Sequence, residues 1–256
     1  MSINQKNTGR ILITAVAAIT IMMIMTSVRV MAGEEYSSGN FVYEVKDNKV
    51  VICGYEPTGI YPDRLKTLVI PSWIDGKKVI GVKRGAISDA DVIMDNVVCS
   101  DHMATVDVTS FNVKGWKGLS ITFGKYTKRY INNVLNEYRF LETRSFKVPK
   151  GAKYLKVAKD KGLYSKDGKT LFAVPSCMSG KFIVPKKTKR IYQYAFCNSY
   201  LKMIKLPKGI KSIGYSALFS EHIEKLTVKV PRKELKRYTK YFRKLQTFPP
   251  VKVKSY

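Results

Sequence analysis

The chain offers few side chains that could do chemistry, and none of them forms a known catalytic or metal-binding motif. Its two histidines, His102 and His222, are far apart, and no metalloprotease, nucleophile-elbow, phosphate-loop or dinucleotide-binding pattern occurs. The aspartates fall mostly in expected turns, where their side chains form local hydrogen bonds, and they are not paired as in a glycosidase. We therefore expect no catalytic residue, no cofactor and no metal site, and not an enzyme; a secreted hydrolase is the remaining enzymatic alternative.

The lysine and arginine residues are the feature that points most clearly to a binding function. The chain has 46 Lys and Arg against 19 Asp and Glu, a formal net charge of +27. Such a surplus is offset either by counterions around solvated lysines or by an anionic partner. Stacked lysines about 5 Å apart repel by roughly 1 kcal/mol even in water. The candidate ligand-binding residues are Lys186, Lys187, Lys189, Arg190, Lys208, Lys211 and Trp116.

Two tryptophans could add an apolar contact to this basic surface. Trp73 follows Ile70-Pro71, and Trp116 lies in the glycine-flanked segment Lys114–Gly118. An exposed ring in such a loop could stack on a sugar or a partner side chain, whereas a ring that packs against the body would anchor the loop. The base-stacking motifs of nucleic-acid modules are absent, so we expect no sequence-specific nucleic-acid partner.

The N-terminal segment 1–32 has the three-part layout of a secretory signal peptide. Lys6 and Arg10 form a positive start, Ile11–Ser27 carries no charge, and small residues flank the expected cleavage site after Ala32. Removing the three basic residues of this segment from +27 leaves +24. An uncleaved anchor is the alternative, although the uncharged run is shorter than the roughly 20 residues that a span needs. No later segment is apolar enough to span a membrane.

The cysteines leave two possibilities open. Cys53, Cys99, Cys177 and Cys197 are widely spaced, and they form no CxxC pair of the kind that binds zinc. An even number in an exported chain permits two disulfides. Their apolar or small neighbours instead favour buried free thiols.

A 22-residue internal repeat organises the chain. Val184–Phe196 aligns with Leu206–Leu218 at five identical positions of thirteen. A unit this short cannot bury an apolar face alone and must stack on its neighbours. The segments Phe182–Val184 and Ile204–Leu206 should therefore pair in parallel, about 4.8 Å apart, with the repeated Ile and Ala pointing inward. Lys186 should then stack over Lys208, and Lys189 over Lys211.

Altered copies of the repeat occur earlier in the chain. The copy at Ile70-Pro71 contains a hairpin signal at Asp75-Gly76, and the copy at Val148-Pro149 leads into a second hairpin at Asp167-Gly168. Between positions 89 and 145 the pattern is faint. Three short, almost evenly spaced strands are expected there as degenerate turns, at Val92–Met94, Val106–Val108 and Leu119–Ile121.

These motifs resemble the BspA-type leucine-rich repeat of bacterial surface and secreted proteins. Val184-Pro185, Ile191 and Ala195-Phe196 carry the repeat pattern, Gly162–Leu171 resembles the family's inserted hairpin, and Phe41–Ile87 resembles its first module. The resemblance implies a curved parallel sheet, an exported location, and adhesion or ligand recognition. The leucine-rich form with a helical horseshoe is not expected.

We therefore expect a repeat solenoid of leucine-rich-repeat type, mostly β, with short parallel strands in one curved sheet, turns, short helical segments and inserted hairpins. A C-terminal amphipathic helix within Arg232–Leu245 should cap the last turn, with an edge strand at Val251–Val253 after it. The expected divisions are a signal peptide (1–32), a first module (33–88), degenerate repeats (89–145), repeats with the inserted hairpin (146–226) and a cap (227–256), with 33–256 forming one solenoid.

The function expected from these features is a secreted or surface-associated binding or adhesion module. Its partner would be an extracellular protein or an anionic glycan or cell-wall polymer, recognised by the basic solenoid face of a monomer with no membrane span in the mature chain. The alternative is a structural protein–protein interaction module of the cell envelope.

Overall fold

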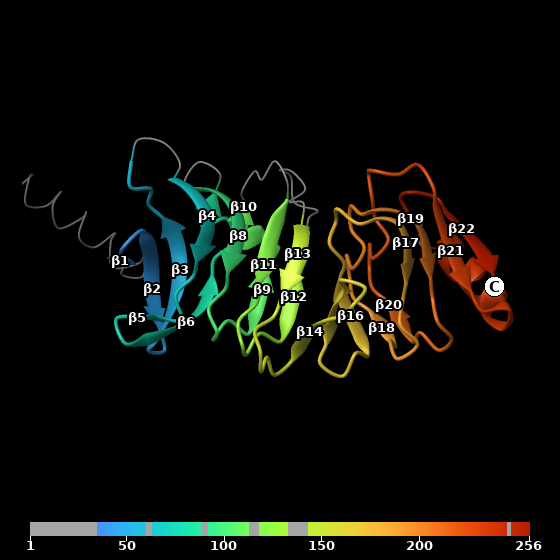
Figure 1. The fold of residues 1–256 in the computed structure, drawn as a ribbon, viewed down its shortest axis with the longest axis horizontal. Coiled ribbons are helices and arrows are strands. Elements are labelled where there is room, and N and C mark those ends of the chain that lie inside the picture. The colour runs from blue at the N-terminus through green and yellow to red at the C-terminus, as the bar shows by residue number, and fades with distance from the viewer. Residues whose placement is uncertain (1–34, 60–62, 89–91, 113–117, 133–142, 245–246) are drawn as a thin grey trace, which may run out of the picture.

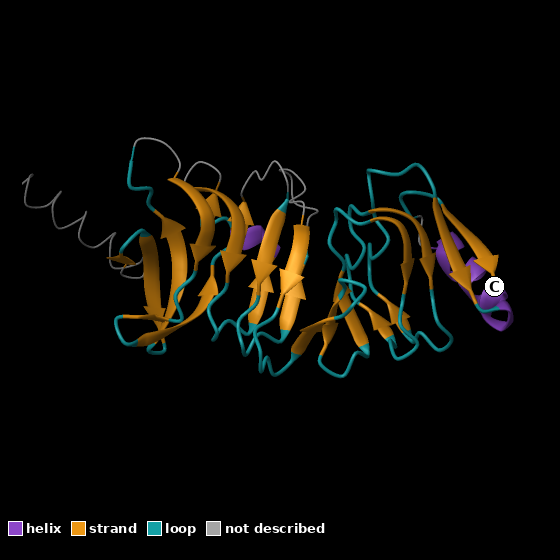
Figure 2. Cartoon of the chain, in the orientation of Figure 1, coloured by secondary structure: helices purple, strands orange, loops and turns teal. Residues whose placement is uncertain are grey.

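The computed structural model describes residues 35–59, 63–88, 92–112, 118–132, 143–244 and 247–256, and within these ranges the chain is a stack of strands along one long axis (Figure 1). The expected signal peptide (1–32) lies outside the described residues. Helices among them are confined to the 3-10 turn η1 and to η2 and α2 at the C-terminal end (Figure 2). The strands are β1 (Glu35–Ser38), β2 (Phe41–Lys46), β3 (Lys49–Tyr55), β4 (Asp63–Val69), β5 (Trp73–Ile74), β6 (Lys77–Val82), β7 (Ile87–Ser88), β8 (Val92–Val98), β9 (Thr105–Asp107), β10 (Phe111–Asn112), β11 (Leu119–Thr122), β12 (Arg129–Ile131), β13 (Thr143–Lys147), β14 (Leu155–Val157), β15 (Leu163–Ser165), β16 (Thr170–Ala173), β17 (Ser179–Ile183), β18 (Arg190–Ile191), β19 (Tyr200–Lys205), β20 (Ser212–Ile213), β21 (Leu226–Val230) and β22 (Val251–Ser255). The helical segments are η1 (Val108–Ser110), η2 (Arg232–Glu234) and α2 (Leu235–Lys244).

The stacked turns form two series of parallel strands, which confirms the expected solenoid class. The longer strands form the sheets β4-β8-β11-β13 and β17-β19-β21-β22, and the shorter strands include the pairs β7-β10 and β9-β12 and the series β16-β18-β20. The expectation of one curved sheet is wrong in this detail, because the described strands divide among several sheets. Each turn bends between its long and its short strand, and the antiparallel strands β14 and β15 enter beside β16.

The weakly repetitive central part is regular in three dimensions. The three expected strands are present, but they alternate between the two series, since β8 and β11 pair with each other and β9 pairs with β12. Asn96 lies opposite Ser120 and Thr105 opposite Arg129, so one full turn leads from each of these residues to its partner. The distance along the chain between successive expected strands is therefore only half a turn. In the later repeats Ile183 lies opposite Lys205 and Arg190 opposite Ser212, which confirms the 22-residue period.

The interior is filled by the apolar positions of the repeat. Ile191, Ala195 and Ala217 are buried as expected, whereas Ile213 is only partly buried at the last complete turn. Gly214 allows the turns to approach closely, because a Cβ at this position would lie 2.3 Å from the backbone nitrogen of Gln193. The repeat thus requires small side chains where neighbouring turns meet.

The C-terminal helix covers the end of the stack. Tyr238 and Phe242, four positions apart on one face of α2, are buried against the last turns. The Tyr241 hydroxyl donates a hydrogen bond to the carbonyl of Ile213 at 2.8 Å. β22 then pairs in parallel with β21, as expected for an edge strand. Leu245, the last residue of the expected helical stripe, lies outside the described residues.

The four cysteines are free thiols in different surroundings. Cys99 and Cys197 are buried, Cys53 is partly exposed and Cys177 is exposed. Burial raises the pKa of both the Cys99 and the Cys197 thiols to about 12, so these two remain protonated at neutral pH. The expectation of buried free thiols is thus met by two of the four.

Candidate binding groove

A groove of about 740 Å³ crosses the short-strand side of the solenoid. Its walls come from four successive strands of this side, β12, β16, β18 and β20, and from the residues that flank them. We call this feature the basic groove, and it is lined by Lys128, Arg129, Thr170, Phe172, Arg190, Ile191, Tyr192, Gln193, Lys211, Ser212, Gly214 and Tyr215.

Strand alternation and register bring the positive charges into this groove. Arg190 is exposed while the next residue, Ile191, is buried, because successive side chains of a strand point to opposite faces. Thr170, Arg190 and Ser212 are register partners across β16, β18 and β20. The N–H of Lys211 donates to the carbonyl of Lys189 at 2.7 Å, which places these two lysines on adjacent turns. The expected stacking of Lys189 and Lys211 is therefore confirmed at the backbone.

Aromatic rings form the apolar part of the groove. Phe172 and Tyr192 meet edge to face with ring centroids 5.4 Å apart. Tyr215 is 70% exposed, and its ring edge meets Tyr194 at 6.1 Å. A ring this exposed is available to contact a ligand in the groove.

The groove lies in a stretch of the chain that has no acidic residue. Between Gly168 and Ser220 the sequence contains neither Asp nor Glu. The basic residues of the same stretch are Lys169, Lys181, Lys186, Lys187, Lys189, Arg190, Lys202, Lys205, Lys208 and Lys211. Since no lining residue of the groove is acidic either, its four cations have no partner of opposite charge within the lining.

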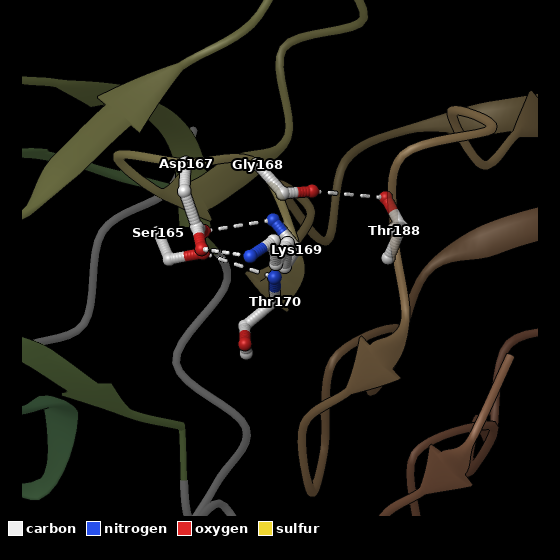
Figure 3. A network of polar contacts seen from close by, with 6 residues as sticks. All are labelled: Ser165, Asp167, Gly168, Lys169, Thr170 and Thr188. Carbon is white, nitrogen blue, oxygen red and sulfur yellow. Dashed lines mark hydrogen bonds and ion pairs between the residues drawn. The ribbon is translucent and has the colours of Figure 1, made fainter.

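The carboxylate of Asp167, the acid just before this stretch, forms its contacts within its own turn (Figure 3). One of its carboxylate oxygens accepts the hydroxyl of Ser165 at 2.6 Å and the N–H of Lys169 at 2.9 Å, and the other lies 3.6 Å from the Lys169 ammonium. These hydrogen bonds, that of Ser165 first, lower the pKa of Asp167. Thr188 donates to the carbonyl of Gly168 at 3.4 Å and so links this hairpin to the lysine-bearing loop of the next turn.

The residues expected to bind a ligand are only partly brought together by the fold. Arg190 and Lys211 line the basic groove. The loops beside the groove carry the exposed residues Lys186, Lys187 and Lys208. Lys189 is half-buried, and its ammonium lies close to Gly209 of the next turn, 3.2 Å from the point that a Cβ on this glycine would occupy. Trp116 lies outside the described residues.

Sequence reasoning missed Lys128 and Arg129, which close the groove from the central repeats. A signal for them was present, because Thr127-Lys128-Arg129 repeats the letters of Thr188-Lys189-Arg190. Thr127 and Thr188 are both buried, so the two tripeptides occupy equivalent corners of their turns. The faint repeat pattern of the surrounding segment concealed this correspondence.

Both histidines of the chain lie outside the groove lining and pack against aromatic rings. His102 packs between Trp73 and Tyr126, and His222 stacks on Tyr200 with ring centroids 4.4 Å apart. Among the described residues no group of three or more His, Cys, Asp or Glu side chains could hold a metal ion. No helix of these residues is long and apolar enough to cross a membrane.

Comparison with known proteins relates the repeats to a family. Residues 168–250 match the BspA type leucine rich repeat region in six copies. A leucine-rich repeat protein from Eubacterium ventriosum is similar in structure, with 16% identity over 78% of this chain and 67% of that chain and a TM-score of 0.40. The pneumococcal vaccine antigen PcpA aligns over 87% of this chain and 99% of that chain, with 13% identity and a TM-score of 0.29. No curated protein matches.

Proposed function

We infer that this chain, whose residues 168–250 match the BspA-type leucine-rich repeat, is a binding module of the cell surface or its surroundings. We propose that it holds an anionic polymer in the basic groove. The signal-peptide pattern of residues 1–32 supports export. The observation that carries the proposal is the composition of the groove, which combines four cations and three aromatic rings with no acid among its lining residues.

The shape of the groove favours a chain-like ligand. The groove crosses four strands, of which β16, β18 and β20 are paired neighbours about 4.8 Å apart, so a polymer can contact several turns at once. Each cation then meets a negative charge of the same molecule, and the contacts add without a new loss of translational freedom. A small anion would use only one or two of these positions.

The exposed lysines beside the groove extend the same positive field. Lys186, Lys187 and Lys208 lie on the loops after β17 and β19, where they would raise the local concentration of polyanion and speed its arrival. Their contribution should be strongest at low salt, because charges farther apart than about 8 Å are largely screened at 0.15 M.

The test is retention of residues 33–256 on teichoic acid, mucin glycans, heparin and DNA along a salt gradient. A variant with charge reversal at Lys186, Lys189, Lys208 and Lys211 should elute at much lower salt than the wild type. The matched control reverses four lysines outside the groove and its loops, Lys46, Lys49, Lys66 and Lys181, and so has the same net charge. Equal elution of the two variants would refute a localised site and leave only generic attraction of the whole chain.

The alternative is a protein-interaction module of the envelope. It predicts association that is insensitive to salt, through apolar side chains such as Tyr215 and Phe248, which are 70% and 55% exposed. Retention on none of the polymers, together with salt-insensitive capture of an envelope protein, would favour it over the proposed function.

A further inference from the structure

A row of aromatic side chains lies on the segments that follow the long strands β4, β8, β11 and β13. Trp73 meets His102 edge to face with ring centroids 5.0 Å apart, and His102 stacks on Tyr126 at 5.9 Å and 8°. These three residues come from successive turns. Together with Tyr154 on the next turn they form what we call the aromatic ladder. Trp73 and Tyr154 are 53% and 41% exposed.

The backbone of these loops fixes the ladder in place. The N–H of Asp101 donates to the Ser72 hydroxyl at 3.0 Å, and the N–H of Tyr126 donates to the Asp101 carbonyl at 3.0 Å. At Gly124 a Cβ would lie 2.0 Å from the carbonyl oxygen of Ser100, so only glycine lets the two loops approach this closely. The rings are therefore held by the stacking of the turns.

A lysine ammonium lies over the ring of each of three ladder members, Trp73, Tyr126 and Tyr154. Lys78 is 5.5 Å from the centre of the Trp73 ring, Lys125 and Lys153 are 5.7 and 5.0 Å from that of Tyr126, and Lys128 is 5.1 Å from that of Tyr154. Two acids of this region are used by other groups: the Asp101 carboxylate accepts the backbone N–H of Lys125 at 2.8 Å, and the Asp75 carboxylate accepts the hydroxyl of Tyr43. Ring and positive charge thus recur together from turn to turn.

The ladder continues into the basic groove. Lys128 lies over Tyr154 and also lines the groove. The chain connection is direct, because the loop that carries Tyr126 and Lys128 leads into β12 and Arg129. In Figure 1 these loops follow the lower edge of the molecule, from β5 and β6 towards β18 and β20.

We infer that the ligand is an acidic polysaccharide whose negative group is attached to the sugar ring itself; this inference rests on the proposed function. A pyranose ring presents C–H bonds that pack on the negative face of an aromatic ring, and a carboxylate or sulfate on the same pyranose ring reaches the adjacent ammonium. In a nucleotide the phosphate is separated from the base by the sugar. A polyol phosphate of the teichoic-acid kind has no ring in its backbone. Neither carries its negative charge on the ring that would pack against Trp73, Tyr126 or Tyr154, where the lysine ammonium groups lie.

The test compares probes that separate ring from charge. Polygalacturonate carries a carboxylate on each ring and dextran sulfate carries sulfates on its rings; polyphosphate has no ring, and oligothymidylate has its bases distant from its phosphates. The variant Trp73→Ala with Tyr154→Ala should lose about tenfold in affinity for polygalacturonate or dextran sulfate and keep its affinity for polyphosphate. If the variant loses more affinity for polygalacturonate, the group recognised is a carboxylate; if it loses more affinity for dextran sulfate, the group is a sulfate. Phe248→Ala, at an exposed ring of the C-terminal end, is the matched control and should bind as wild type.

A second measurement does not depend on the stability of that variant. The chain has two tryptophans, so Trp116→Phe leaves Trp73 as the single reporter. Its fluorescence should change and saturate with polygalacturonate or dextran sulfate but not with polyphosphate. An unchanged signal with every probe, an equal loss for polyphosphate, or a larger loss for oligothymidylate would overturn the inference and leave the proposed function standing. Failure of the wild type to bind any polyanion would overturn both.

Discussion

The register of the last sheet makes a prediction about stability that does not involve the ligand. Lys205, Lys229 and Lys254 are register partners on β19, β21 and β22, so three lysines lie side by side. Like charges opposite each other on neighbouring strands are destabilising. The Lys205 ammonium is 3.7 Å from the centre of the Tyr256 ring, which stabilises one of the three.

The magnitude follows from the spacing of the strands. Strands about 4.8 Å apart let long side chains spread their ammonium groups to about 7 Å, where two charges in water repel by about 0.6 kcal/mol. Lys229 has two such neighbours, so Lys229→Gln should raise the free energy of unfolding by about 1 kcal/mol at low salt and by less than about 0.5 kcal/mol at 0.5 M salt. Lys254 has one neighbour, and Lys254→Gln should give about half the gain.

Urea unfolding at 10 mM and 0.5 M salt measures this effect, since urea adds no ionic strength. A loss of stability in Lys229→Gln, or a gain that does not change with salt, would contradict the register argument. Equal gains for Lys229→Gln and Lys254→Gln would mean that general net charge, not this row, is responsible.

Three further predictions concern the body of the solenoid. Gly214→Ala should lower the free energy of unfolding by about 1–3 kcal/mol and weaken polyanion binding, because the added Cβ meets the backbone of the preceding turn. Gly59→Ala, with open space around it, should leave the free energy of unfolding unchanged, and urea unfolding distinguishes the two variants. Phe242→Ala should cost about 3–5 kcal/mol by uncovering the last turn, against almost nothing for the exposed Lys240→Ala, and a thermal shift no larger than that of Lys240→Ala would argue against the cap. The pKa of Cys99 is raised by burial from 9.0 to about 12, so its contribution to stability is complete below pH 9 and is lost as the pH rises towards 12; Cys99→Ala should flatten this decline, and identical pH profiles would disprove the link.

The repeat pattern was sufficient to predict the solenoid and its ends. The spacing of Pro185, Ile191 and Ala195 predicts parallel strands and a small-residue corner because stacked turns place equivalent residues side by side, and the structure confirms both. The stripe of Tyr238 and Phe242 likewise predicts the cap. These features depend on local periodicity, which a single sequence displays directly.

The groove and the two-series architecture could not be predicted in the same way. β9 and β12 are paired, but their sequences show little of the repeat pattern. The expected strands were therefore not recognised as alternating between the long-strand and the short-strand series. Lys128 and Arg190 are far apart in the sequence, and only the stacked turns bring them to one groove. The exposure of Trp73 also depends on how its hairpin packs, so the sequence left open whether the ring is exposed or anchors its loop.

The most direct test of the central claim is the salt dependence of polygalacturonate affinity for the wild type and for a double variant of the groove, Arg190→Glu with Lys211→Glu. If the groove holds the polymer, the slope of log affinity against log salt should become shallower by about two for this variant. The control Lys252→Glu with Lys254→Glu, which has the same net charge, should keep the wild-type slope. Equal slopes for the two variants would contradict the account, because the attraction would then belong to the charge of the whole chain and not to the groove.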